Sequence, residues 1–222
     1  MKAMFSFITF CLTKNTLGII FCQLFVCISL IDSSYAQSWT FIKEENGIKL
    51  YTRQEPGSSL KSYKGIMTFH APIEKACSMV GNARNFDWWG PDFKNIKVLA
   101  YQKDKFVHYY YIYDMPWPFT DRDLAVNATV KTDTLTGEYT VTSKPLLNAI
   151  PVKTDLVRIT KYNQKWSMLP LDNGNVQVTL EGILDPGGNV PSWLYNMLVT
   201  EMPMKTLGLL RDRILSDKPA NK

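Results

Sequence analysis

The sequence predicts an α+β fold in which a curved antiparallel sheet wraps around one long C-terminal helix and encloses an apolar cavity. Three observations indicate this fold. Strand-like segments recur from Trp39 onward, and the last of them covers about 176–183. A Gly-rich turn at 185–188 follows it. An amphipathic helix then opens at Pro191 and continues almost to the end of the chain.

The composition fits one domain behind a targeting segment. The chain has 222 residues, 45% hydrophobic and 13% aromatic, enough to bury one full core. Lys2 and Lys14 flank apolar runs, and an uncharged stretch at 17–31 leads to the small-x-small sequence at 34–36. This pattern predicts a cleavable Sec-type signal peptide over 1–36 and a single domain over 37–222. A retained membrane anchor is the alternative, although this stretch is shorter than the roughly 20 residues of a spanning helix.

Cysteine and charge content restrict the compartment and the partners. The predicted signal peptide holds all the cysteines except Cys77, so the exported domain forms no internal disulfide and depends on packing. The formal net charge of +5 decreases by one when the segment is removed. Lys and Arg are scattered, which argues against a nucleic-acid partner but allows weak attraction to an anionic membrane. We therefore expect a periplasmic or secreted protein.

The remaining elements follow in order. A turn at Glu45-Asn46-Gly47 predicts a hairpin, and Pro72 predicts the start of a short helix that ends near Gly81. The alternation over 122–131 predicts an antiparallel strand with one buried face. Pro203 predicts a kink or a break of the final helix near Val199. The other expected strands are 39–43, 48–53, 60–70, 96–101, 105–114, 139–143, 156–162 and 166–168.

Residues for catalysis are scarce. The two histidines, His70 and His108, both fall in expected strands and belong to no motif. Asp121 and Asp123 bracket Arg122, which predicts a local ion-pair or turn network. No Ser, Cys or Lys lies in a nucleophile motif, and no metal-ligand spacing occurs. The sequence therefore predicts a protein without catalytic residues, cofactor or metal.

Aromatic residues are dense in this chain. They form an aromatic core in one interpretation and line a cavity in the other. Tyrosines around an apolar hollow supply contact area and hydrogen-bonding groups, which suits an amphipathic ligand. The residues concerned are Trp88, Trp89, Tyr109, Tyr110, Tyr111, Tyr113, Trp117, Phe119, Tyr162, Trp166 and Trp193.

Three segments, 89–91, 115–123 and 185–194, carry a family resemblance. Together they resemble the START (steroidogenic-acute-regulatory-related lipid-transfer) family, most closely its phosphatidylcholine-transfer-protein branch. The resemblance covers about 39–215. It implies a helix-grip (START/Bet v 1-like) fold, in which the sheet and the terminal helix enclose a tunnel for one lipid. It also implies that the loop with Trp117 and Phe119 forms a membrane-docking lid together with the terminal helix.

The resemblance further implies the ligand contacts. Tyr111 and Tyr162 match two positions of the aromatic cage that encloses choline in phosphatidylcholine-binding members. Leu124 stands where these members have a third cage tyrosine. Their phosphate-binding arginine aligns near Asn85 or Phe86, and the arginine of sterol-binding members aligns with Ala128. Neither lipid is therefore identified as the ligand. The full set of expected contacts is Tyr109, Tyr111, Tyr113, Arg122, Leu124, Val126, Ala128, Tyr162, Trp193 and Met197.

The leading hypothesis is an exported, non-catalytic carrier for one phospholipid or other amphipathic lipid, which meets a membrane surface transiently. An enzyme of the helix-grip superfamily, similar to cyclases and aromatases, is the first alternative, and the sparse histidines argue against it. A ligand sensor that never transfers lipid is the second. The sequence leaves the oligomeric state open.

Overall fold

The computed structural model describes residues 38–82 and 85–216. The predicted signal peptide lies outside these ranges. No helix within them is both long enough and apolar enough to cross a membrane.

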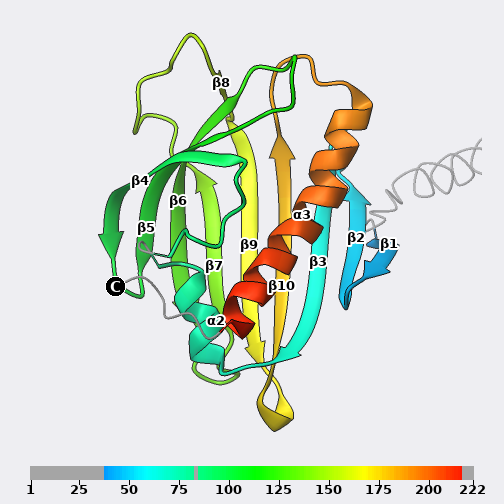
Figure 1. The fold of residues 1–222 in the computed structure, drawn as a ribbon, viewed down its shortest axis with the longest axis vertical. Helices are drawn as coiled ribbons and strands as arrows, with labels where there is room; N and C mark the ends of the chain where they lie inside the picture. The colour runs from blue at the N-terminus through cyan, green and yellow to red at the C-terminus, as the bar shows by residue number, and fades with distance from the viewer. Residues whose placement is uncertain (1–37, 83–84, 217–222) are drawn as a thin grey trace, which may run out of the picture. The chain divides into compact units, whose positions relative to one another are not determined.

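The described chain is an antiparallel sheet with a long C-terminal helix, as the sequence predicts (Figure 1). The elements are β1 (Thr40–Glu45), β2 (Ile48–Gln54), β3 (Lys61–His70), α2 (Ile73–Met79), β4 (Phe93–Gln102), β5 (Phe106–Tyr113), β6 (Arg122–Thr132), β7 (Tyr139–Pro145), β8 (Val157–Arg158), β9 (Lys161–Pro170), η1 (Asp172–Gly174), β10 (Asn175–Asp185) and α3 (Ser192–Leu215).

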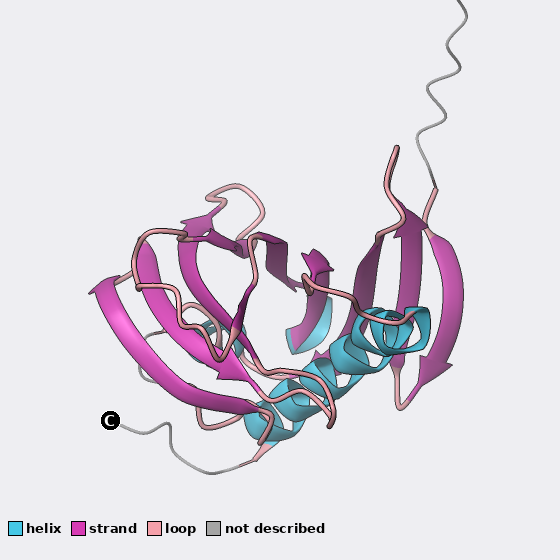
Figure 2. Cartoon of the chain, turned by 90° about the horizontal axis from the view of Figure 1, so that it is seen from above, coloured by secondary structure: helices cyan, strands magenta, loops and turns pink. Residues whose placement is uncertain are grey.

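The strand order is β1-β2-β3-β10-β9-β7-β6-β5-β4, and the short β8 pairs in parallel with the start of β6. The last strand, β10, therefore joins the first three strands to the others. Seen from above, the sheet curves around α3 (Figure 2). This arrangement confirms the predicted fold class.

Turn residues take the backbone conformations that the sequence pattern predicts. Asn46 and Gly47 connect β1 to β2 with φ values of 52° and 74°. Asn173 and Gly174 turn the chain into β10 with φ values of 63° and 74°. Glycine and asparagine adopt positive φ at low cost, which explains why the chain reverses at these two positions.

Helix α3 rests directly on the sheet. A Cβ atom added at Gly65 of β3 would lie 2.3 Å from Cδ1 of Leu207, so the glycine lets the helix approach closely. Leu207, Leu210 and Ile214 are fully buried in the core. The helix runs unbroken through Pro203, and the break expected near Val199 does not occur.

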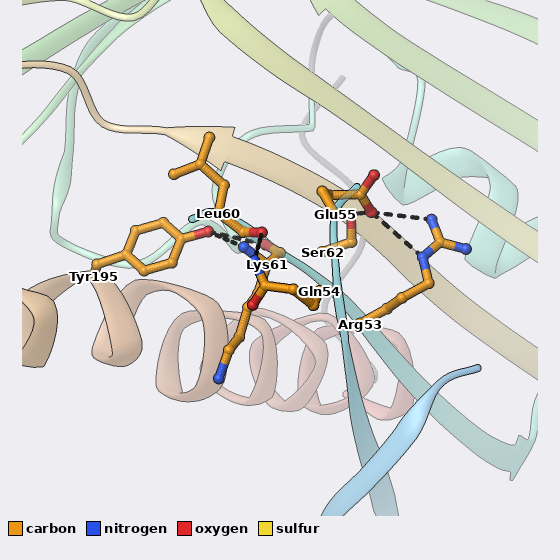
Figure 3. Close-up of polar contacts among 7 residues, drawn as sticks. All are labelled: Arg53, Gln54, Glu55, Leu60, Lys61, Ser62 and Tyr195. Carbon is orange, nitrogen blue, oxygen red and sulfur yellow. Dashed lines mark hydrogen bonds and ion pairs between the residues drawn. The ribbon is translucent and has the colours of Figure 1, made fainter. Parts of the chain in front are cut away.

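Hydrogen bonds attach the N-terminal part of α3 to the start of β3 (Figure 3). The Tyr195 hydroxyl accepts a hydrogen bond from the Lys61 N–H at 2.6 Å and donates one to the Lys61 carbonyl at 3.0 Å. Nearby, the Glu55 carboxylate accepts hydrogen bonds from Arg53 and from the Ser62 hydroxyl. These contacts fix one end of the helix to the sheet.

The prediction that β6 is buried on one face only is wrong for its first half. Asp123 and Ala125 point away from the α3 side, yet they are 1% and 2% exposed. The connection at 146–156 covers them, because its apolar side chains pack on the outer residues of β5 and β6. These outer contacts are made by Leu146, Ile150 and Leu156 with Tyr110, Ile112 and Ala125.

A buried ion pair holds this connection in place. Arg158 contacts both carboxylate oxygens of Asp123, at 2.6 Å and 2.8 Å, and Tyr110 donates a hydrogen bond to the same carboxylate. The predicted strand 156–162 is therefore divided, because Arg158 draws β8 toward β6 before β9 begins. The expected local network around Arg122 is confirmed only for Asp121, which accepts a hydrogen bond from the nearby Met115 N–H. It is wrong for Asp123, because the ion-pair partner of Asp123 lies 35 residues further along the chain.

Candidate ligand-binding cavity

A cavity of about 80 Å³ lies between the sheet and α3. Aromatic side chains from three places in the chain form part of its wall, and Met202, Thr206 and Leu209 of α3 also line it. The aromatic lining residues are Phe86, Trp88, Trp89, Phe93, Tyr109, Tyr111, Tyr162 and Trp166. We call this space the aromatic cavity.

Trp89 lies at the centre of the aromatic cluster. Its ring centroid is 4.9 Å from those of Phe86 and Phe93, and 5.5 Å and 5.6 Å from those of Tyr109 and Tyr111. All four contacts are edge-to-face, a favourable geometry for aromatic pairs. The segment between α2 and β4 thus inserts rings against the tyrosines of β5.

The polar groups in the wall are neutral. Gln164 donates a hydrogen bond to the Tyr63 hydroxyl at 3.1 Å and accepts one from the Trp166 ring N–H. The Tyr109 hydroxyl and Ser143 share another hydrogen bond. Among the described residues that line the cavity there is no Asp, Glu, Lys, Arg or His. The site can therefore hold hydrocarbon and hydrogen-bond a polar group.

Burial keeps the tyrosine hydroxyls protonated. It raises the pKa of Tyr63 to about 12 and places the pKa values of Tyr109, Tyr111 and Tyr162 well above the ordinary range. At neutral pH these hydroxyls therefore act as neutral donors and acceptors.

A smaller cavity of about 20 Å³ adjoins the aromatic cavity. Tyr113 and Arg122 line it, and it shares Phe93, Tyr111 and Met202 with the aromatic cavity. Arg122 is only 4% exposed. This arrangement extends an apolar space toward a buried cation.

Backbone carbonyl groups from two separate segments accept hydrogen bonds from Arg122. Its Nε and Nη2 donate to the carbonyls of Pro186 and Gly187, both at 3.2 Å, and its Nη1 donates to the Thr120 carbonyl. Burial lowers the pKa of Arg122, and Asp121 opposes that effect more weakly. The guanidinium therefore connects the start of β6 to the turn before α3.

An open groove of about 750 Å³ lies beside α3. Charged side chains, among them Glu45, Asp92, Glu201 and Lys205, line much of it. Such a lining suits hydrocarbon less well than the aromatic cavity. The groove shares Met202 and Leu209 with the aromatic cavity, so it lies directly outside the cavity wall.

The structure gathers most of the expected ligand contacts around the two cavities. The aromatic cavity takes Tyr109, Tyr111, Ala128 and Tyr162, and the smaller cavity takes Tyr111, Tyr113 and Arg122. Leu124 and Val126 are buried in the core and line neither cavity. Met197 lines the outer groove, and Trp193 is 60% exposed. Ligand contact by these residues stays a prediction.

Trp88 and Trp89 are among the aromatic residues that the sequence places in a core or around a cavity, but the expected ligand contacts contain no residue of the segment at 86–93. Its aromatic density was a usable signal, because Phe86, Trp88, Trp89 and Phe93 occur within eight positions. The segment has little regular structure, so periodicity could not orient these rings.

Exposed aromatic rings lie at the end of the sheet where β6 begins. Trp117, in the β5–β6 loop, is 92% exposed, and its peptide bond to Pro118 is cis. The ring of Phe119 packs on that of Trp193 with a centroid distance of 6.0 Å. The β5–β6 loop and the turn before α3 thus meet at one end (Figure 1).

Comparison with known proteins identifies the family. No family model matches the chain. An uncharacterized Pseudomonas aeruginosa protein, PA1579, is 30% identical over 179 residues, 81% of this chain and 88% of that protein. The crystal structure of a STAR-related lipid transfer protein fragment from Xanthomonas axonopodis is 30% identical, with a TM-score of 0.72 over 80% of this chain and 99% of that one. This chain belongs to the START family.

More distant START structures share the fold. Human STARD10 has a TM-score of 0.71 at 17% identity, with coverage of 85% of this chain and 78% of that one. Human StAR-related lipid transfer protein 5 has a TM-score of 0.71 at 13% identity, with coverage of 90% and 97%. These matches support the START fold, and membership of the phosphatidylcholine-transfer branch stays a prediction.

Proposed function

We propose that this START protein is an exported carrier that binds one amphipathic lipid in the aromatic cavity and catalyses no reaction. The observation that carries the proposal is the cavity itself. It lies between the sheet and α3, and its wall combines aromatic rings with neutral hydroxyl and amide groups. Transfer of hydrocarbon from water into such a site contributes about 0.8 kcal/mol per methylene group.

The cavity must widen to accept a lipid. Its volume of about 80 Å³ is far below the roughly 300–1,000 Å³ of ordinary ligand pockets. The rings around Trp89 fill the space that acyl chains need, and Met202 and Leu209 separate this space from the outer groove. We therefore place the lipid path between α3 and the segment at 86–93.

Among the described residues, two ion pairs cross this path. The pair between Arg213 and Asp87, at 3.0 Å, joins side chains that are 9% and 32% exposed and lies toward the C-terminal end of α3. The ion pair between Lys205 and Asp92 joins side chains that are 49% and 35% exposed. Such exposed pairs contribute only about 0–1 kcal/mol each. Near the N-terminal end of the helix, Tyr195 stays hydrogen-bonded to Lys61. In this proposal α3 moves away from Asp92 while its first turns remain attached to β3.

Two further features support a carrier over an enzyme and over a sensor. The histidines lie outside the aromatic cavity, with His70 exposed and His108 packed on Phe106. The exposed Trp117 and Trp193 suit insertion into a membrane interface, where indole rings are favoured. Export rests on the signal-peptide pattern of residues 1–36.

Native mass spectrometry with lipid extraction tests the proposal on protein purified from the organism that makes it. A stoichiometric co-purified lipid is the expected result, followed by transfer of that lipid between vesicles. Lipid binding without transfer would favour a sensor, and a chemically altered lipid would favour an enzyme. An empty protein that takes no lipid from vesicles would overturn the proposal.

A cross-link tests the proposed path. In a Cys77→Ala background, the pair Asp92→Cys and Lys205→Cys is joined by a short cleavable thiol-reactive linker. We expect lipid uptake to slow at least tenfold and to recover on cleavage. The control pair, Lys94→Cys and Asp114→Cys, replaces another surface ion pair that does not involve α3, and its uptake should be unchanged. Equal uptake by both linked proteins would exclude this path.

A further inference from the structure

Arg122 is a buried cation without a carboxylate partner. It forms no ion pair in the described ranges, although it is 4% exposed. Asp121 is adjacent in the sequence, but its Oδ1 accepts a hydrogen bond from the Met115 N–H at 3.0 Å. The contrast with Arg158 is direct, because that buried arginine binds the Asp123 carboxylate through two nitrogens.

A guanidinium at this buried position keeps its positive charge. Arginine stays protonated in proteins and carries five N–H donors. The carbonyls of Thr120, Pro186 and Gly187 accept three of them. Neutral carbonyls satisfy hydrogen bonds without neutralising the charge, and buried charges are ordinarily paired. The site therefore has positive charge and two N–H groups left for an anion.

The surroundings of Arg122 continue the ligand space. The smaller cavity places Arg122 beside Tyr113 and shares Phe93, Tyr111 and Met202 with the aromatic cavity. Apolar and aromatic surface thus continues from the aromatic cavity to a wall that contains a cation. This polarity is complementary to an amphiphile that has an anionic head.

We propose that Arg122 binds the head of the lipid and that the preferred ligands of this START protein are amphiphiles with an anionic oxygen group, a phosphate or a carboxylate. Arg122 donates hydrogen bonds to the anionic oxygens, with Tyr113 beside it, and the hydrocarbon occupies the aromatic cavity. This assignment rests on the proposed function, because it takes the two cavities as one lipid site.

The location of Arg122 fits the handling of a lipid at a membrane. Its contacts are to Thr120, next to Phe119 of the docking loop, and to Pro186 and Gly187, in the turn that leads to Trp193. The anion site therefore lies under the loops that expose Trp117 and Trp193. A lipid captured there keeps its head at the membrane-facing end while its chains enter the cavity.

A headgroup series on the unmodified protein tests the assignment. Dodecyl phosphate, dodecanoate, dodecanol and dodecyltrimethylammonium share one chain and differ in the head. Binding to protein expressed from the full-length chain is measured by displacement of a fluorescent fatty alcohol. We expect both anions to bind at least about tenfold more tightly than dodecanol and the cation to bind more weakly than dodecanol. Inorganic phosphate alone should not displace the probe, which separates a lipid head from a free anion site.

Arg122→Gln locates the effect. This variant should lower the anion-to-alcohol affinity ratio to about one, and Arg122→Lys should retain part of it because the charge remains without the two-pronged donor geometry. The control Arg53→Gln removes a partly exposed arginine that lines neither cavity. Its anion-to-alcohol affinity ratio should equal that of the wild type.

Each outcome is informative. If dodecanol binds as tightly as the anions, the anionic preference is refuted and the carrier proposal stands. If none of the amphiphiles binds, the carrier proposal fails as well. If Arg122→Gln keeps the wild-type ratio, another group binds the head. If that variant does not fold, the headgroup series on the wild type still decides whether the head is anionic.

Discussion

Replacement of Arg158 by methionine should strongly destabilise the fold. The substitution removes the charge but keeps an unbranched side chain of similar reach. It leaves the Asp123 carboxylate buried, at 1% exposure, with only the Tyr110 hydroxyl as a hydrogen-bond donor. It also removes the donor to the carbonyls of Ile150 and Pro151 in the connection that covers β5 and β6.

The size of the effect follows from burial. Removing one partner of a buried ion pair costs about 3–5 kcal/mol, because the other charge remains without compensation. For a domain of 150–250 residues, each kcal/mol shifts Tm by about 2–4 °C, so Tm should fall by roughly 6–20 °C. The matched control is Arg53→Met. Its ion pair with Glu55 joins side chains that are 36% and 24% exposed, so a loss of about 0–1 kcal/mol is expected.

Calorimetry and urea unfolding of the three proteins measure this difference. We expect the Tm and the free energy of unfolding of Arg53→Met to be close to those of the wild type. Both quantities should be well below these values for Arg158→Met. A loss in Arg158→Met no larger than that of the control would refute the reasoning. It would mean that water reaches Asp123 and that the connection at 146–156 does not depend on the ion pair.

Three further predictions concern docking, pH and thiol chemistry. Trp117→Asp should slow transfer between vesicles several-fold while leaving equilibrium lipid binding nearly unchanged. Leu135→Asp, which alters a 95% exposed side chain in the β6–β7 loop, should transfer at the wild-type rate, and equal rates for both variants would exclude docking by Trp117. Burial raises the pKa of Tyr63 to about 12, above the value of about 10 in unfolded chains, so its contribution to stability is complete below pH 10 and is lost between pH 10 and 12. In urea unfolding from pH 9 to 11, the free energy of unfolding should decrease less steeply with pH for Tyr63→Phe than for the wild type. Identical slopes for the two proteins would contradict this. Burial also raises the pKa of Cys77 to about 12, so peptide mapping after iodoacetamide treatment at pH 8 should find Cys77 alkylated far more slowly in folded than in unfolded protein.

The parts of the fold that depend on residues close together in the sequence were predictable. The Asn46-Gly47 turn and the long final helix are examples, because their signals lie within a few positions. The two-sided burial of β6 was not predictable in this way. It depends on the connection at 146–156 and on Arg158, which meets Asp123 across 35 residues.

The candidate site was predictable only in part, for the same reason. On β5, the alternation of side chains puts Tyr110 on the opposite face from Tyr109 and Tyr111. In the structure Tyr110 lies on the outer face of the sheet, and Tyr109 and Tyr111 line the aromatic cavity. Trp89 was not among the expected ligand contacts, because contacts with β5 and with the distant α3, not local periodicity, orient its segment. Asp92 of this segment contacts Lys205, 113 residues away.

The position of β10 also has a consequence for biogenesis. This strand is the last to be synthesised, and it lies between β3 and β9. Until it arrives, the first three strands have no partner that connects them to the other half of the sheet, and the helix that covers the cavity follows later still. Contacts between such distant parts of a chain form slowly. The sheet therefore cannot be completed until β10 has been made, a property that is compatible with the export proposed above.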